Sequence, residues 1–474
     1  MKKSVSNLPL YVDLDGTLIK SDLMFESVLI LLKQNPFLII AVFFWLLRSS
    51  AYLKAELAKR VEVSIANLPV NEELLLFLKE EKKRGRKLIL ISAANQKVVD
   101  HVNSHFKLFN VAIGSSSTHN LKAQNKLDRI ILLTGGEEFS YAGNSHADLP
   151  IWKEASEALL VNCSEQLTSR VNAKNTRIFD AAQPFAKKLF QAMRPHQWMK
   201  NFLVFVPLVL SHQVDQANLL LNSGVAYIGF CFCASSIYFL NDLFDLNADR
   251  KHQTKRDRAF ASGELSLLAG FFTGPTLFLL ALLIALSLPK SFVLILLLYW
   301  LLACLYSYLL KRLFLIDVLT LATLYTLRIV AGGAAIAVET TVWLLAFSFF
   351  LFLGLALVKR VTELLNVISQ GKNNVEGRAY RDNHLSLLSW TGIACSAAAI
   401  FVFILYITAP ETTNLYSTPI VLWLICPLLV FLLCRIWQFA HAQKLEEDPV
   451  LFALTDKTGQ VVTIACGILI WIAV

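Results

Sequence analysis

The sequence predicts a multidomain protein, with an α/β domain of the Rossmann type followed by an all-α bundle of nine transmembrane helices. Three observations carry this prediction. The 474-residue chain is 55% hydrophobic with a mean hydropathy of +0.54, which is more apolar than a soluble protein of this length. Up to about residue 185, polar and apolar segments alternate as in a soluble domain. In residues 186–474 the apolar runs become long enough to cross a membrane.

Residues 1–185 form the predicted soluble domain. Short apolar runs alternate there with charged, helix-like segments, a pattern typical of strands that alternate with helices. The predicted strands are Leu8–Leu14, Lys87–Ser92, Asn110–Ile113, Phe139–Gly143 and Ala158–Asn162. The segment Val28–Leu47 departs from the pattern because it is almost wholly apolar, yet only about 11 residues follow Pro36, too few for a span. We expect a helical cap insertion near residues 22–70, with an apolar helix suited to a membrane surface.

Nine apolar runs make up the predicted membrane domain. They are Phe202–Leu210, Leu219–Leu240, Leu268–Leu288, Phe292–Leu310, Val318–Val338, Trp343–Val358, Leu388–Ile407, Ile420–Leu433 and Val461–Val474. Basic residues gather in the loops after the even-numbered runs, whereas the loops after the odd-numbered runs carry only Lys290. This asymmetry predicts a multi-pass protein of the inner or plasma membrane whose basic loops and N-terminal domain are cytoplasmic.

Composition excludes several functions. The formal net charge of +9 does not indicate nucleic-acid binding, because the basic residues lie mostly in loops between apolar runs. The eight cysteines form no Cys-x-x-Cys pair, so we expect neither a zinc site nor a disulfide framework. We also expect no signal peptide, since the polar start leads directly into the first predicted strand. The sequence does not determine the oligomeric state.

The run Asp13-Leu14-Asp15-Gly16-Thr17 follows the first predicted strand and carries two carboxylates that can do different work. Asp13 is placed to attack phosphorus and to hold Mg²⁺, while Asp15 is placed to protonate the leaving oxygen. A turn rich in Asp and Gly is the alternative explanation. Ser92 ends a second strand, Lys126 precedes a helix, and Asp148 follows a later strand.

This order of Asp, Ser, Lys and Asp resembles the haloacid dehalogenase (HAD) superfamily over roughly residues 8–180. The resemblance implies that Asp13 is the nucleophile, Asp15 the acid/base, and that Ser92 and Lys126 bind phosphate. It also implies a Mg²⁺ site built from Asp13 and Asp15 with Asp148, the last as a direct or second-shell ligand. The last motif departs from the family because Asn144 stands where an acid is common. The alternative is a regulatory domain without activity.

The run Asn241–Asp249 closes the second apolar run and precedes a basic loop. Asp242, Asp245 and Asp249 are spaced at i, i+3 and i+7, which puts them on one face of a helix. Such a cluster at the end of a membrane span is costly unless a cation neutralises it. Mg²⁺ holding a diphosphate is the cation that we expect, because Mg²⁺ favours a few carboxylates plus phosphate oxygens. A solvated helix end is the alternative.

Nine spans with this acidic motif resemble the UbiA superfamily of intramembrane prenyltransferases, from about Met193 to the end. The resemblance implies that Asn241, Asp242, Asp245 and Asp249 hold the diphosphate through Mg²⁺, with Asp242 and Asp245 catalytic. The second acidic motif of the family is replaced here by a mixed basic and acidic set. Its members are Lys359, Arg360, Glu363, Arg378 and Tyr380, and a further polar series runs from Lys311 through Asp317 to Arg328. Arg328 is expected to face the interior, with an ion pair to Asp317 as the other interpretation.

The run Arg194–Asn201 enters the first span and supplies Arg194, Lys200 and Asn201 as candidate phosphate-binding residues. Together with the motifs above it resembles one UbiA branch, the decaprenyl-phosphate phosphoribosyltransferases. The implied reaction moves 5-phosphoribose from phosphoribosyl diphosphate to a polyprenyl phosphate in the membrane. Because the two phosphate sites share one chain and one side of the membrane, a separate hypothesis is that the soluble domain then removes the 5-phosphate. Two alternatives stay open: transfer of a prenyl group from a prenyl diphosphate to an aromatic acceptor, and a membrane transporter with a regulatory soluble domain.

Overall fold

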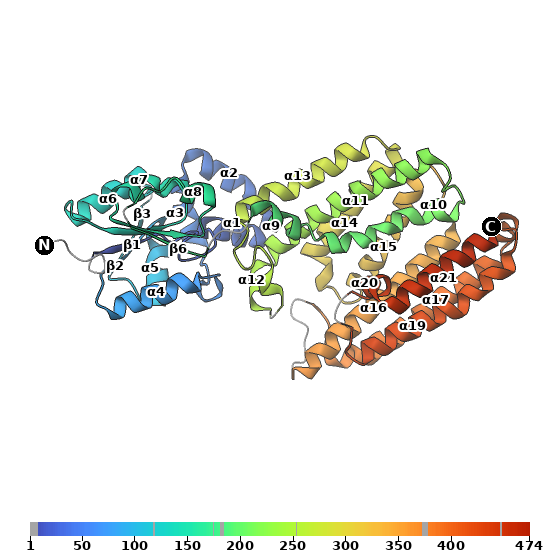
Figure 1. Ribbon diagram of the computed structural model, residues 1–474. Helices are drawn as coiled ribbons and strands as arrows, with labels where there is room; N and C mark the ends of the chain where they lie inside the picture. Colours follow the sequence, from blue (N-terminus) through green and yellow to red (C-terminus); the bar gives the residue numbers. More distant parts are fainter. Residues whose placement is uncertain are drawn as a thin grey trace. The chain divides into compact units, whose positions relative to one another are not determined.

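The computed structural model describes residues 8–116, 119–173, 175–180, 184–252, 254–371, 378–445 and 448–474. The chain forms two compact units, each coloured along the sequence in Figure 1. The first unit contains Met1–Met193 and Phe239–Thr273, and the second contains Arg194–Tyr238 and Gly274–Val474. The first unit therefore includes a segment, Phe239–Thr273, that the sequence analysis assigned to the membrane domain.

A six-stranded parallel sheet forms the centre of the first unit, in the order β3-β2-β1-β4-β5-β6. The strands are β1 (Leu10–Val12), β2 (Leu88–Asn95), β3 (Val111–Ser115), β4 (Ser140–Gly143), β5 (Glu157–Val161) and β6 (Asn175–Phe179). Tyr11 pairs with Ile89 on one side and with Tyr141 on the other. The predicted parallel α/β domain is confirmed, and β6 is a strand that the sequence pattern did not reveal. This strand order reverses at β1, the place where such sheets bind ligands.

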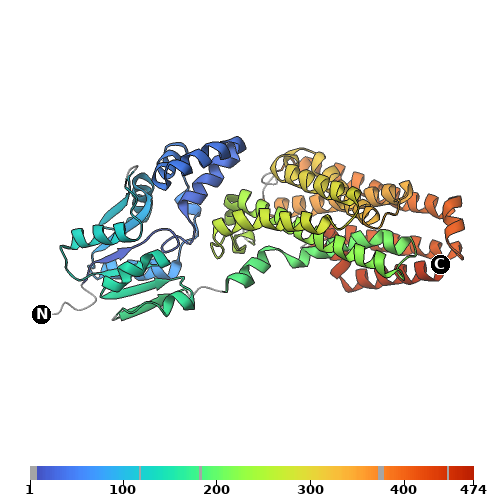
Figure 2. The same cartoon turned by 90° about the horizontal axis from the view of Figure 1, so that it is seen from above.

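Helices cover both faces of this sheet, as Figures 1 and 2 show. Alternate residues of β1 and β2 point to opposite faces, because side chains alternate along a strand. Leu10 and Leu88 pack with α4 (Glu72–Lys83) and α5 (Gln96–Phe106) in one core. Tyr11 and Ile89 pack with α6 (Gln124–Thr134) and α7 (Leu149–Glu154) in the other. The two cores hold β1 rigidly, and with it the polar residues that follow it.

Between β1 and β2 the chain forms a helical insertion of α1 (Leu23–Gln34), α2 (Ile39–Arg48) and α3 (Ser50–Arg60). The first unit also contains the end of α11 (Ala217–Phe244), the short α12 (Leu246–Lys251) and the start of α13 (Leu267–Ala285). Glu26 of α1 and Arg250 of α12 form a buried ion pair, with Glu26 Oε1 and Arg250 Nη2 2.6 Å apart. This pair joins the helical insertion to the end of a membrane helix.

Apolar helices make up most of the remaining chain. Among the described residues, seven are long and apolar enough to cross a membrane, or eight if one pair bent by 77° counts as a span. The seven are Ala217–Phe244, Leu267–Ala285, Lys290–Tyr308 (α14), Ile316–Ala335 (α15), Val342–Ser369 (α16), Asp382–Thr408 (η8 and α17) and Pro419–His441 (η9 and α19). The bent pair is α20 (Pro449–Thr455) with α21 (Lys457–Ala473). The multi-pass prediction is confirmed.

The predicted count of nine spans is not confirmed. The run that was expected to be the first span, Phe202–Leu210, lies in a 3-10 helix (η5, Pro195–Phe205) followed by α10 (Val206–Leu210). Gly332 of α15 touches this segment so closely that a Cβ there would lie 2.0 Å from the carbonyl oxygen of Val204. Small residues at such contacts let helix backbones approach one another in membrane proteins.

Candidate functional sites

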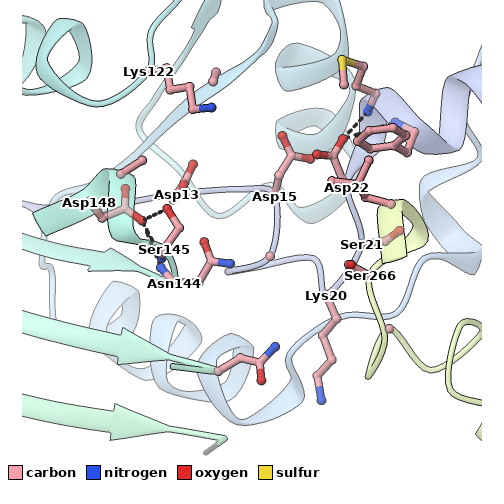
Figure 3. A pocket seen from close by; sticks show the side chains of 18 of the residues that line it. Asp13, Asp15, Lys20, Ser21, Asp22, Lys122, Asn144, Ser145, Asp148 and Ser266 are labelled. Carbon is pink, nitrogen blue, oxygen red and sulfur yellow. Dashed lines mark hydrogen bonds between the residues drawn. The ribbon is translucent and has the colours of Figure 1, made fainter. Parts of the chain in front are cut away.

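The first candidate site lies at the carboxyl end of β1 in the first unit. Asp13 follows β1 directly, and its Oδ1 accepts a hydrogen bond from the Leu14 amide at 2.8 Å. Lys126, at the start of α6, places its Nζ 2.9 Å from the same oxygen. Asp13 and Lys126, which the sequence analysis assigned to one phosphate site, therefore lie in direct contact. Figure 3 shows Asp13, Asp15 and Asp148 around one cavity.

Asp148 is fixed by hydrogen bonds on both carboxylate oxygens. Its Oδ1 accepts from the Tyr141 hydroxyl at 2.7 Å. Its Oδ2 accepts from the amides of Asn144 and Ser145 at 3.2 and 3.0 Å and from the Ser145 hydroxyl at 3.0 Å. Lys126 Nζ is 3.8 Å from Asp148 Oδ1. With these partners Asp148 orients the Asn144 loop and Lys126, which suits an outer-shell role.

Asp15 differs from Asp13 in its surroundings. Its Oδ1 accepts a hydrogen bond from the Leu23 amide at 3.0 Å, at the start of α1. Burial, together with the nearby charge of Asp22, raises the pKa of Asp15 to about 8. Asp15 is therefore protonated at neutral pH, as a proton donor must be. For Lys126, burial alone would lower the pKa, but the charges of Asp13 and Asp148 raise it, so the ammonium stays charged.

Gly16 and Asn144 meet at the floor of this site. Gly16 has a φ of +76°, and a Cβ there would lie 2.1 Å from Asn144 Nδ2. Thr17 Oγ1 lies 3.3 Å from Asn144 Oδ1 and donates to it. The close packing of Asn144 on the Asp13–Thr17 loop fixes the position of its amide next to the two aspartates.

The cavity around these residues has a volume of about 1060 Å³. Three lysines that the sequence analysis did not select, Lys20, Lys54 and Lys122, also line it. Their signal in the sequence was weak, because isolated lysines are common on solvated surfaces. Ser92 behaves differently: it is fully buried, and its hydroxyl accepts a hydrogen bond from the Ala94 amide at 3.0 Å. The adjacent Ala93, and not Ser92, lies on the cavity wall.

The donor chemistry of this cavity fits Mg²⁺. Within the described part of the chain, no three His, Cys, Asp or Glu side chains are grouped closely enough to hold a metal by themselves. Asp13 and the Asn144 amide nevertheless offer oxygen donors to the same cavity. Mg²⁺ commonly uses one or two protein carboxylates and takes its other ligands from water and substrate phosphate.

The second candidate site is the acidic motif at the end of α11, also in the first unit. Asp242 and Asp249 are each 4% exposed, and Arg258 Nη1 lies 3.3 Å from Asp242 Oδ1 and 2.7 Å from Asp249 Oδ2. The chain itself thus supplies a cation to these two carboxylates. Asn241 Oδ1 is buried and has no hydrogen-bond partner among the residues that the structure describes, so it is an acceptor that a bound cation would satisfy. Asp245 occupies the position just before α12 and lies between the other two in sequence.

The third candidate site lies in the second unit and is centred on Asp448, which the sequence analysis missed. Asp448 Oδ2 pairs with Lys200 Nζ at 3.0 Å and with Lys359 Nζ at 2.8 Å. Its Oδ1 accepts from the Tyr325 hydroxyl at 3.1 Å. The available signal was an Asp-Pro pair before an apolar run, the pattern of a helix start, and Asp448 does cap α20. Two lysines from distant segments meet at one carboxylate here.

Arg328 lies close to this cluster and faces the interior, as one interpretation predicted. Its Nε donates to Asn201 Oδ1 at 3.0 Å and its Nη2 donates to the Tyr299 hydroxyl at 2.7 Å. The alternative ion pair between Arg328 and Asp317 is therefore not formed. Asp317 instead pairs with Arg360, whose Nε lies 2.6 Å from Asp317 Oδ2. Asp317 and Arg328 lie on the same helix, α15, and each finds its partner on another segment of the chain.

The Asp317–Arg360 pair is the centre of a closed network. Arg360 Nη1 is 2.6 Å from Glu363 Oε2, and Arg378 Nε is 3.2 Å from the same oxygen. Tyr380 donates its hydroxyl to Asp317. Arg360 is 1% exposed and every nitrogen of its guanidinium has a protein partner. These side chains tie α15, α16 and the segment after Arg378 together, and their role in substrate binding stays a prediction.

Arg194 and Lys311 complete the set of predicted residues. The guanidinium of Arg194 stacks over Tyr238, 5.1 Å from its ring centre. Lys311 lies in the short helix η7 (Leu310–Arg312). The second unit also encloses an apolar cavity of about 540 Å³, lined by side chains such as Leu351, Phe352 and Phe403. Its size and lining suit a hydrocarbon chain.

These features define a polytopic membrane protein with buried charged groups between its helices and a parallel α/β domain. A model described as the UbiA prenyltransferase family matches residues 202–456, so the chain belongs to that family and is a membrane transferase. Protein y4nM of Sinorhizobium fredii, which is described as uncharacterized, is 37% identical over 95% of this chain and 88% of its own length. The decaprenyl-phosphate phosphoribosyltransferase of Mycolicibacterium smegmatis is 32% identical over 200 residues, which cover 40% of this chain and 63% of that protein.

Among solved structures, a UbiA homolog from Archaeoglobus fulgidus bound to GPP and Mg²⁺ matches 60% of this chain and 100% of its own. The sequence identity is 18% and the TM-score is 0.47.

Proposed function

We propose that the membrane domain, residues 186–474, transfers 5-phosphoribose from phosphoribosyl diphosphate to a polyprenyl phosphate. The observation that carries this choice of substrates is the 32% identity to a decaprenyl-phosphate phosphoribosyltransferase. The pairing of Lys200 and Lys359 on one carboxylate supports it, because cationic groups held close together in the interior suit an anionic headgroup. The apolar cavity of the second unit supports a polyprenyl tail.

The acidic motif is the proposed diphosphate site. Asp242, Asp245 and Asp249, with the Asn241 amide oxygen that lacks a partner among the described residues, would hold Mg²⁺, which when bound neutralises the diphosphate leaving group. Arg258 already places a positive charge against Asp242 and Asp249. This arrangement lets the guanidinium turn toward the substrate diphosphate when the carboxylates take another cation. No general base is required, because the acceptor phosphate is already ionised at neutral pH.

The N-terminal domain, residues 1–185, is proposed to be a HAD-like phosphatase that removes the 5-phosphate from the transferred ribose. A carboxylate oxygen of Asp13 attacks phosphorus, the bond from phosphorus to the 5-oxygen breaks, and Asp15 gives its proton to that oxygen. Water then hydrolyses the aspartyl phosphate and releases inorganic phosphate. Lys126, which is 2.9 Å from Asp13, offsets the charge of the transferring group.

The lining of the phosphatase cavity supports a lipid-linked substrate. Besides Asp13 and Asp15, the wall includes Gly263, Ser266 and Leu268, and Leu268 belongs to α13, a membrane helix. Figure 3 shows Ser266 beside Lys20 and Ser21 at this wall. A phosphate carried on a membrane lipid would reach such a cavity with its tail in the bilayer. We further propose that both reactions occur on the cytoplasmic side of the inner membrane.

The test uses purified full-length protein in lipid with Mg²⁺, radiolabelled phosphoribosyl diphosphate and a polyprenyl phosphate. Label should enter lipid with the wild type and not with Asp242→Asn. The matched control is Asp257→Asn, since Asp257 lies in the same loop with its side chain 80% exposed. Label that enters lipid equally with Asp242→Asn would overturn the proposed site.

The same assay tests the phosphatase. The 5-phosphorylated lipid should accumulate with Asp13→Asn, while the exposed Asp128→Asn on α6 should behave as the wild type. If no label enters lipid with any protein, prenyl diphosphates and aromatic acceptors become the substrates to test, as the family description would then suggest.

A further inference from the structure

Helix α2 of the first unit is apolar on both its faces. Val42 is 8% exposed and packs with Leu38 and Trp45 into the core of the α/β domain. The opposite face is also apolar and uncovered in this structure. It presents Phe37 (82% exposed), Ile39 (41%), Ile40 (60%), Phe43 (57%), Phe44 (63%), Leu46 (52%) and Leu47 (66%). A helix with apolar residues all round is stable only where both of its faces are shielded from water.

Charge around α2 has one sign. The chain contains no acidic residue between Glu26 and Glu56, whereas Lys33 and Arg48 flank the helix. Both of these basic residues are exposed, and the guanidinium of Arg48 lies 4.2 Å from the centre of the Tyr52 ring. Exposed basic groups beside an apolar face suit anionic lipid headgroups.

Contacts within the first unit hold the start of this insertion against the end of a membrane helix. Lys33, the next-to-last residue of α1, donates from Nζ to the carbonyl oxygen of Phe244 at 3.0 Å, and Phe244 is the last residue of α11. The buried Glu26–Arg250 pair joins the same two segments. Because α11 is long and apolar enough to cross a membrane and ends at Phe244, the chain enters α2 a few residues after its contact with the end of that helix.

We propose that α2 lies in the interface of the lipid bilayer, with the side chains of Phe37, Ile40, Phe43, Phe44 and Leu47 among the acyl chains. The occupant of this face is lipid, since α1, which leads into α2, contacts the end of an apolar helix long enough to span and the face carries no acidic group. The helix would then fix the α/β domain to the membrane at a point separate from the chain connection after Met193. The cavity around Asp13 and Asp15 would then stay at a fixed distance from the bilayer, within reach of phosphate groups carried on lipids.

The experiment places the photoreactive residue p-benzoylphenylalanine at single positions of the full-length protein. The protein is reconstituted in vesicles of phosphatidylethanolamine and phosphatidylglycerol with a tritiated lipid tracer. Position 44 is the test, with position 47 as a second test in case the first variant does not fold. Position 132 is the matched negative control, since Leu132 is 71% exposed on α6 of the same domain. Position 471 on α21 is the positive control, since Trp471 is 79% exposed on an apolar helix of the bent pair that can count as an eighth span.

We expect irradiation at position 44 or 47 to give about five- to tenfold more lipid adduct than position 132, and an amount similar to position 471. Lipid adduct no higher than at position 132 would overturn the proposal. A crosslink to a second copy of the chain instead of lipid would also overturn it, because the face would then be a protein interface.

Discussion

At the scale of the residue, Asp13 and Asp15 are two residues apart and have different surroundings. Asp13 contacts the ammonium of Lys126, whereas Asp15 accepts one backbone amide and sits near Asp22. Burial raises the pKa of both, but among the described residues a cation lies within hydrogen-bond distance of Asp13 alone, where it stabilises the charged form. One carboxylate is thus suited to act as a nucleophile and the other as a proton donor.

Gly16→Ala should lower the phosphatase activity without a comparable loss of protein stability. The new Cβ would collide with the Asn144 amide and move it away from Asp13, so we expect phosphate release to fall by about tenfold or more. Gly136→Ala is the control, because Gly136 also has a positive φ but no atom within 4 Å of a Cβ. Phosphate release by the two purified variants would be compared once measurement of the Tm of each has shown that both are equally stable. Equal activities would show that the contact with Asn144 is unimportant.

Cys163 should react very slowly with alkylating agents in the folded protein. Burial raises the pKa of its thiol to about 12, so almost no thiolate, the reactive form, exists at pH 8. An unfolded cysteine ionises at about pH 8.5, so this group favours folding below that pH and loses its contribution as the pH rises toward 12. Mass spectrometry of the Cys163 peptide after iodoacetamide treatment, with and without urea, measures the difference. Equal labelling in both conditions would contradict the expectation.

At the scale of the element, the close contact of α15 with η5 depends on a residue without a side chain. Gly332→Ala should lower the Tm of the detergent-solubilised protein, because the backbone carbonyl of Val204 occupies the place of the new Cβ. Gly224→Ala in α11 is the control, since no atom lies within 4 Å of its Cβ position. Alanine favours helix by about 0.5–1 kcal/mol over glycine, so the control should be unchanged or slightly more stable. A Gly332→Ala variant as stable as the control would argue against this contact.

Elements also explain which predictions could be made from the sequence. Short apolar runs between charged segments predicted the strands of the α/β domain, and long apolar runs predicted the membrane helices. In both cases the element is buried on all sides, in protein or in lipid, and so needs apolar residues along its length. The segment Phe202–Leu210 looked like a span in composition, but Pro207 and its contact with α15 leave it as a 3-10 helix and one short α-helix. The edge strand β6 was missed because four of its five residues are exposed.

At the scale of the whole molecule, a buried ion pair joins the helical insertion to the end of a membrane helix. Glu26→Gln would leave Arg250, whose side chain is 4% exposed, without its charged partner. We expect a loss of about 3 kcal/mol or more in unfolding free energy for the first unit. Arg250→Gln should cost a similar amount, and the double variant should lose less than the sum of the two.

Thermal unfolding followed by tryptophan fluorescence in detergent would measure all three variants as a double-mutant cycle. Losses that add without any coupling would mean that the pair does not join these segments.

The sequence by itself determined the two classes of domain, the acidic motifs at Asp13 and Asp242, and the family likeness, because each depends on local pattern and spacing. Tertiary structure alone decided the partners of the buried charges. Asp448 gathers Lys200 and Lys359 from distant segments, and Asp317 pairs with Arg360 instead of Arg328. The physical reason is that an unpaired buried charge is costly, so each one is paired with an opposite charge that the packing of helices places next to it. Residues far apart in the sequence can be neighbours in that packing.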